Sequence, residues 1–373
     1  MFKLWTVVHH TPIINYFLEK DESLDKVLNI FIRVNSGGTI LSYSDLLLSV
    51  ASAQWKEKDA REQVTEFVDE LNSVSDGFNF EKDIVLKSCL VLSDFSDIAF
   101  KVDNFNKANM LQIEKQWDQI TTALRHAVTL ISSFGYSRDT LTANNAIIPI
   151  AYYLLKKGLP KSFDQASHFS SDRKNIRRWL ILSLLKRAFG GQPDTVLRPI
   201  REILKNNADE FPLQAIREKF KGTTKSLEFT DDDIENLLFS KYGVEYTFST
   251  LVLLYPTLDF RNKFHVDHIF PRSLFTRAKL LKRNVSSNDM EFFGEQADQL
   301  SNLQLLEGLP NQEKSDLDFQ QWLNKNYPQQ GERIEYFSKN YIPNVDLSIT
   351  NFRQFIEKRR ELLKTKFAQL LHG

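Results

Sequence analysis

The sequence of 373 residues contains a single cysteine, Cys89. A lone cysteine cannot form a disulfide within the chain, and it cannot supply a cysteine-based zinc site. The simplest compartment for such a chain is a reducing cytoplasm. The N-terminal residues also lack a basic region followed by an apolar run, so we do not expect a secretory signal peptide.

Long apolar runs and net charge are missing as well. No apolar stretch approaches the roughly 20 residues that span a bilayer, so we expect no membrane partner. The 48 Lys and Arg residues balance the 48 Asp and Glu residues, which argues against indiscriminate binding to polyanions. The basic residues are unevenly distributed, however: the stretch 272–283 contains five and no acidic residue. The alternative to nucleic-acid binding for this run, as for 173–187 and 353–366, is a solvated helix face.

Helical periodicity dominates the rest of the sequence. We expect helices at 23–34, 43–54, 60–73, 81–92, 110–134, 145–157, 171–189, 196–206, 211–219, 231–239 and 351–371. The convincing strand signals lie around 265–270 and 302–306, while 246–254 fits either a helix or a strand. These patterns predict a mainly α fold in three parts: residues 1–55, a helical region 56–240, and a C-terminal domain 241–373 that ends in a basic helix.

Polar residues interrupt the strand-like segments in a pattern that can carry chemistry. The first segment contains Asp267 and His268 shortly before Pro271, and the second begins with Asn302. Because neighbouring side chains of a strand lie on opposite faces, Asp267 and His268 can share one site only where the strand ends or twists. Pro271 cannot continue a central ladder and so favours such an end. We expect a loop at 272–297 between the two segments.

Each residue type suits one task in phosphodiester hydrolysis. Asp267 and Asn311 offer hard oxygen ligands for Mg²⁺ or Mn²⁺, and the His268 imidazole can take a proton from water near neutral pH. Asn302 can bond to loop backbone and hold His268 in place, and Lys314 can meet a phosphate. Two alternatives stay open: a purely structural role for His268, and a zinc site that it shares with His265, although no spaced third ligand is evident.

The three segments together, D-H-I-x-P, N-L-x-L-L and N-x-x-K over residues 264–317, resemble the ββα-metal HNH nucleases. They are most similar to the HNH-type C-terminal domain (DUF1524) of GmrSD-type, DUF262-containing restriction proteins. The resemblance implies that Asp267 and Asn311 occupy metal-ligand positions. It places His268 at the general base and Asn302 at the orienting asparagine. His265 falls at a variable position and is at most an accessory ligand.

The stretch FIRVNSGGTILS at 31–42 resembles the FxRxNxGGxxLS segment of DUF262 proteins. The resemblance implies that Arg33 and Asn35 line a site for nucleotide or DNA; the alternative is an ordinary turn between two helices. DUF262 proteins carry a DGQQR-type motif before this segment, linked to nucleotide hydrolysis, and this sequence has none. We therefore expect residues 1–55 to be a remnant of a DUF262 (ParB-like) domain. We also expect no NTPase activity and dependence on a DUF262 partner or a missing segment.

Motifs and resemblance predict a metal-dependent DNA endonuclease of the modification-dependent restriction type, acting in defence against foreign DNA. Besides Lys314, five residues of the basic run are expected to contact phosphates: Arg272, Arg277, Lys279, Lys282 and Arg283. Two alternatives remain. The chain could be an inactive or regulatory DNA-binding remnant, or its substrate could be RNA, because the motif addresses phosphate rather than sugar.

Overall fold

The computed structural model describes residues 42–207, 209–256, 258–260 and 262–372, together with seven single residues before residue 42. This part contains sixteen α-helices and one sheet of two strands, so the prediction of a mainly α fold is confirmed. The segment 31–41, with Arg33 and Asn35, lies outside the described residues. Within the described residues, no helix combines the length and apolarity that a membrane crossing requires.

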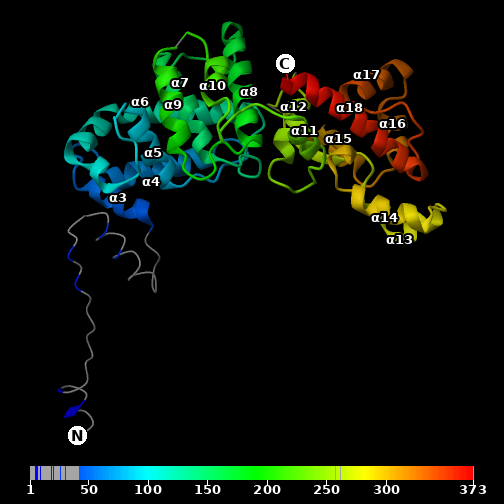
Figure 1. The fold of residues 1–373 in the computed structure, drawn as a ribbon, viewed down its shortest axis with the longest axis horizontal. Coiled ribbons are helices and arrows are strands. Elements are labelled where there is room, and N and C mark those ends of the chain that lie inside the picture. Colours follow the sequence, from blue (N-terminus) through cyan, green and yellow to red (C-terminus); the bar gives the residue numbers. More distant parts are fainter. Residues whose placement is uncertain are drawn as a thin grey trace.

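Ten helices precede the sheet in the chain, and in Figure 1 the last two of them lie beside the C-terminal helix. Five come first: α3 (Tyr43–Ser52), α4 (Ala60–Asn72), α5 (Lys82–Leu92), α6 (Lys107–Ser133) and α7 (Ile147–Lys156). Five follow: α8 (Ser170–Leu185), α9 (Asp194–Lys205), α10 (Leu213–Phe220), α11 (Asp231–Leu238) and α12 (Thr247–Leu254). The start of α3 is set by a reciprocal capping box, in which Ser42 and Asp45 each accept from the other's backbone N–H. At the centre, α7 packs between α6 and α9.

The C-terminal part contains the sheet and six helices. The strands are β1 (Phe264–His268) and β2 (Leu303–Glu307), which agrees with the two predicted strands. The helices are α13 (Arg277–Lys282), α14 (Ser287–Gln296), α15 (Gly308–Lys314), α16 (Phe319–Asn326), α17 (Gln330–Asn340) and α18 (Phe352–His372). The expected loop at 272–297 is therefore wrong: a 3₁₀ turn and helices α13 and α14 occupy it.

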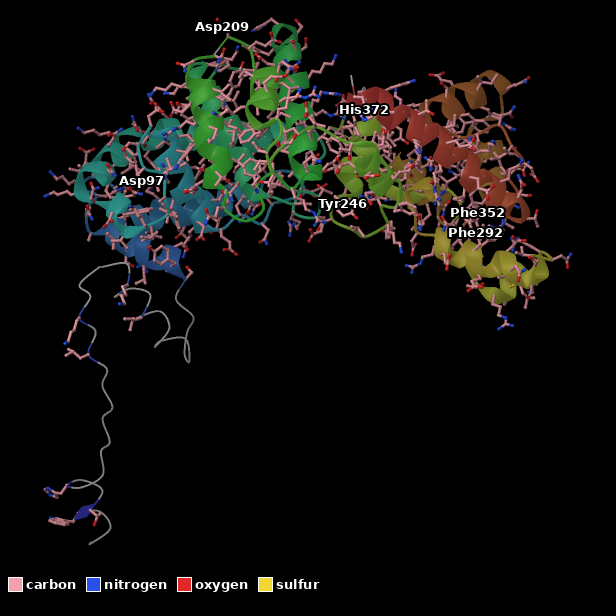
Figure 2. The ribbon with its side chains drawn as sticks, viewed as in Figure 1. Asp97, Asp209, Tyr246, Phe292, Phe352 and His372 are labelled. Carbon is pink, nitrogen blue, oxygen red and sulfur yellow. The ribbon has the colours of Figure 1, made fainter. Side chains whose placement is uncertain are left out.

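Two groups of buried side chains hold the fold together. The larger is built from α3–α12 and also takes in Leu303 and Leu305 of β2 and Leu363, Phe367 and Leu371 of α18. The smaller lies within residues 269–356 and is rich in aromatic rings; Figure 2 shows Phe292 and Phe352 where α14 meets α18. Because β2 and α18 contribute to both groups, the sheet lies where the helical region and the C-terminal part meet.

Candidate functional site

The predicted motif residues lie on the two-stranded sheet and on the helix that follows it. β1 and β2 pair antiparallel, with Asp267 opposite Gln304 and His268 opposite Leu303. Helix α15 begins directly after β2 and packs against both strands. Three segments that are distant in the sequence are thus brought together in the order strand, strand, helix.

His268, at the end of β1, is held by a carboxylate. Its Nε2 atom lies 2.8 Å from Oδ1 of Asp298, and its ring lies against that of Tyr242 with 4.6 Å between centroids. Burial lowers the pKa of His268, and the Asp298 carboxylate partly offsets this effect. The imidazole is therefore neutral near pH 7. The other oxygen of Asp298 lies 3.4 Å from the guanidinium of Arg272, whose side chain is 69% exposed.

Asn302 fixes the chain just after His268. The side chain is fully buried. It accepts a hydrogen bond from the backbone N–H of Phe270 at 2.9 Å and donates to the carbonyls of Phe270 at 3.0 Å and Ala297 at 2.7 Å. These three bonds use the amide oxygen and both donors of the amide nitrogen. They tie the turn after β1 to the residues before β2.

Asp267 lies on the opposite face of β1 from His268, as strand alternation dictates. Its two carboxylate oxygens lie 3.0 and 2.7 Å from the ammonium of Lys314, which also donates to the carbonyl of His268. Gln304 donates to the same carboxylate at 2.9 Å. We expected Lys314 to contact a phosphate. Instead its side chain is 1% exposed and faces Asp267, because α15 lies directly against this face of the sheet.

The remaining predicted ligands, Asn311 and His265, line a cleft of about 640 Å³ beside β1. Tyr242, the neighbour of His268, is part of the same lining, as are three carboxylate residues: Asp76, Asp139 and Glu245. Lys263 also lines the cleft and pairs with Asp76 at 2.9 Å, so Asp139 and Glu245 leave a net negative charge, which disfavours entry of a phosphate backbone.

The predicted metal ligands do not fit a divalent cation as they are arranged. Both oxygens of Asp267 are already in contact with an ammonium group, so a cation could bind there only after Lys314 had moved away. Among the described residues, no group of three or more His, Cys, Asp and Glu side chains is arranged to hold a metal ion. The imidazoles of His265 and His268 belong to opposite faces of β1, since the two residues are three positions apart; this arrangement offers no shared zinc site.

The basic run begins beside the His268–Asp298 pair. Arg272 opens it, α13 carries Arg277, Lys279 and Lys282, and Arg283 directly follows that helix. Arg277 and Lys282 are exposed, and Lys279 and Arg283 are partly exposed. In Figure 1, α13 and α14 form the outer end of the C-terminal part. We call Arg272, Arg277, Lys279, Lys282 and Arg283 the basic arm. Its positive charges begin at Arg272, beside the His268–Asp298 pair, and continue along α13.

The basic stretch 353–366 is different from the basic arm, because two of its arginines are engaged within the fold. Arg353 donates to Asp289 at 3.0 Å. Arg359 is fully buried and donates to five backbone carbonyls, including those of Ser301 and Leu303 on either side of Asn302. Burial lowers the pKa of Arg359 to about 10, so the guanidinium stays charged at neutral pH.

Sequence reasoning missed Asp298, Gln304, Tyr242 and Arg359. Gln304 had a usable signal, because it is the one polar residue within the apolar run Leu303–Leu306, and correct strand register would have placed it opposite Asp267. Asp298, Tyr242 and Arg359 had no local signal, since their roles depend on contacts with distant segments.

No protein-family model matches this chain, and no curated protein matches it in sequence. The likeness to HNH nucleases therefore depends on the motif residues of the sequence alone.

Proposed function

We propose that this protein hydrolyses phosphodiester bonds in DNA, with His268 as the general base. The observation that carries the proposal is the His268–Asp298 pair at the end of β1, beside the exposed Arg272. A neutral imidazole that is held by a carboxylate and adjoined by an exposed guanidinium has the parts that this chemistry needs: a proton acceptor, its orienting partner and a phosphate contact.

The direction of proton transfer follows from the hydrogen bond. With Nε2–H donating to Asp298, the lone pair of the neutral ring is on Nδ1. Nδ1 takes a proton from a water molecule as its oxygen attacks phosphorus, and Asp298 stabilises the imidazolium that results. The bond from phosphorus to the leaving sugar oxygen breaks, that oxygen takes up a proton from solvent water, and the imidazolium later returns its proton to solvent. Arg272 offsets charge on the phosphate, while Asn302 keeps the turn in position.

Mg²⁺ or Mn²⁺ is the cofactor that the HNH likeness implies, with Asp267 and Asn311 as its ligands. Such an ion would neutralise charge on the phosphate when bound. The Asp267 carboxylate is already paired with Lys314, so no step of the proposed reaction depends on a metal ion. Whether cleavage requires a divalent cation is tested by comparing Mg²⁺, Mn²⁺ and EDTA.

The test uses the full chain with plasmid DNA, a single-stranded oligonucleotide and RNA, each in Mg²⁺, Mn²⁺ or EDTA. General-base catalysis contributes about 10²–10⁴-fold, so His268→Ala should lower the rate by at least about 100-fold. Asp298→Asn should also lower it, by less. His265→Ala, three residues earlier on the opposite face of β1, is the matched control and should cleave like the wild type. Equal cleavage by wild type and His268→Ala refutes the proposal.

A second candidate function is DNA binding without hydrolysis, favoured by the Lys314 ammonium that occupies both oxygens of Asp267. Two measurements distinguish these functions. The second is established if the protein binds DNA, if this binding weakens with added salt and with removal of charge from the basic arm, and if no cleavage occurs in any cation. Cleavage that depends on His268 establishes the first. We propose defence against foreign DNA as the setting of the first, to be tested by comparing modified with unmodified plasmid.

A further inference from the structure

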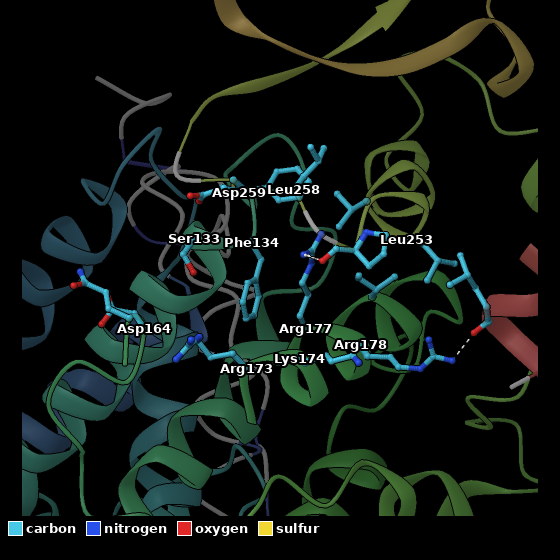
Figure 3. Close-up of a pocket in the computed structure, with 16 residues that line it drawn as sticks. Ser133, Phe134, Asp164, Arg173, Lys174, Arg177, Arg178, Leu253, Leu258 and Asp259 are labelled. Carbon is cyan, nitrogen blue, oxygen red and sulfur yellow. Dashed lines mark hydrogen bonds between the residues drawn. The ribbon is translucent and has the colours of Figure 1, made fainter. Parts of the chain in front are cut away.

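A second cavity, of about 740 Å³, is lined by none of the motif residues, although it shares Phe260 with the cleft beside β1. Figure 3 shows its walls. They are the end of α6 with Ser133 and Phe134, one face of α8, residues 252–256 and 258–260, and Leu370 near the end of α18. Its volume is within the range of about 300–1,000 Å³ that small-molecule sites occupy.

Four cations line this cavity from one face of α8: Arg173, Lys174, Arg177 and Arg178. Their spacing places them on two successive turns of the helix. The arginines are held by backbone carbonyls. Arg173 donates to Phe163 and Ala166, Arg177 to Tyr255 and Pro256, and Arg178 to Leu370. Each makes at most two such bonds and carries five N–H donors, so the guanidinium groups are fixed in place without being saturated.

The positive charge of this face is not neutralised by ion pairs. Over the part of the chain that the structure describes, none of the four cations forms a salt bridge with a carboxylate, and Lys174 is exposed. The lining also contains two carboxylates, Asp164 and Asp259, against the four cations. The cavity therefore has a net positive charge, which favours an anionic ligand.

The rest of the lining constrains which anion fits. The lining also contains apolar side chains, among them Val252, Leu253 and Leu258. An apolar wall suits a flat ring system, and fixed guanidinium groups suit the oxygens of a phosphate. In Figure 3, Asp164 lies at the end of the cavity away from Arg178, where it can accept hydrogen bonds from sugar hydroxyls. The cations of α8 can thus contact phosphate, Asp164 can contact a sugar, and the apolar side chains can contact a base.

We propose that this cavity binds a free nucleoside phosphate, with its phosphates against the α8 cations and its base on the apolar wall. The site is separate from the His268–Asp298 pair and independent of the hydrolytic function proposed above.

The experiment is isothermal titration calorimetry on the full chain with ATP and GTP. Adenosine, guanosine, pyrophosphate and a short oligonucleotide are the comparison ligands. We expect a nucleoside triphosphate to bind at least about tenfold more tightly than pyrophosphate or either nucleoside, because it engages both surfaces. Lys174→Gln should weaken this binding about three- to tenfold, and Lys174→Glu should weaken it further. Lys174 is exposed, so neither change disturbs the packing of α8.

Lys115→Gln is the matched control, since Lys115 is an exposed lysine of α6 outside the cavity, and it should bind like the wild type. The proposal is overturned if neither ATP nor GTP binds at millimolar concentration. It is overturned equally if Lys174→Glu and wild type bind alike, or if only the oligonucleotide binds. Triphosphate binding that falls from wild type through Lys174→Gln to Lys174→Glu supports it.

Discussion

Replacing Lys314 by methionine should strongly destabilise the C-terminal part. The Lys314 side chain is 1% exposed and that of Asp267 is 10% exposed, and the ammonium contacts both carboxylate oxygens. Lys314→Met leaves the buried carboxylate without its counter-charge, and Asp267→Asn leaves a buried ammonium. Breaking a buried pair from one side costs about 3–5 kcal/mol. A cost of that size lowers the melting temperature by about 6–20 °C, at about 2–4 °C for each kcal/mol.

The double variant Asp267→Asn/Lys314→Met tests whether the two residues act as a pair. It removes both charges at once, so its loss should be smaller than the sum of the two single losses, by about 1–3 kcal/mol. Thermal unfolding at pH 7, followed by near-ultraviolet circular dichroism, measures all three variants. Lys358→Met is the control, because Lys358 and its partner Glu361 are 53% and 67% exposed, and such pairs contribute about 0–1 kcal/mol.

Equal melting temperatures for Lys314→Met and Lys358→Met would refute this reasoning. They would mean that Lys314 does not hold Asp267 in the folded protein. The carboxylate would then be open to a divalent cation, and the metal-dependent form of the hydrolytic mechanism would regain its first ligand.

Three further predictions concern other parts of the fold. Burial raises the pKa of Cys89 to about 12, so iodoacetamide at pH 8 should label it only after unfolding, as read by mass spectrometry. Arg359→Met should lower the free energy of unfolding by about 3 kcal/mol or more in denaturant titrations, because five backbone carbonyls, four of them in buried hydrogen bonds, lose their donor. The backbone N–H of Ala99, then Lys101 and Arg198, lower the pKa of Asp97. The wild type should therefore be more stable than Asp97→Asn above about pH 4 and lose that advantage as the pH falls.

The helices that could be predicted are those with one buried and one exposed face. α4 is an example: Val64, Phe67, Val68 and Leu71 are buried while the residues between them are largely exposed, so its period is visible in the sequence. α12 is the opposite case. All of its residues are buried, and a segment without an exposed face has no periodicity by which a helix can be distinguished from a strand.

Helices α13 and α14 escaped prediction because tertiary contacts support them. α13 is only six residues long, and isolated helices of that length do not form in water. α14 is stabilised through Phe293, whose ring lies 5.1 Å from that of Phe352 on α18. That contact joins residues almost sixty positions apart, which no local pattern of charge or hydrophobicity can reveal.

The residue types of the candidate site could be predicted, but their pairing could not. Asp267 and His268 are neighbours in the sequence, and strand alternation sends their side chains to different partners: Lys314 from α15 and Asp298 from the segment before β2. Lys314 has the charge that suits a phosphate and equally the charge that suits a buried carboxylate. Which of these it meets depends on how closely α15 packs on the sheet, and that is a property of the assembled fold.

The last helix of the chain takes part in positioning the candidate base, although it lies far from it in the sequence. Arg359 of α18 holds the carbonyls of Ser301 and Leu303, and Asn302 between them holds both backbone groups of Phe270. His268 precedes Phe270 by two residues, so a change at α18 reaches the histidine through two sets of hydrogen bonds. The basic character of α18 is thus partly structural. Removal of α18 should therefore displace His268 from Asp298 even though neither residue is altered.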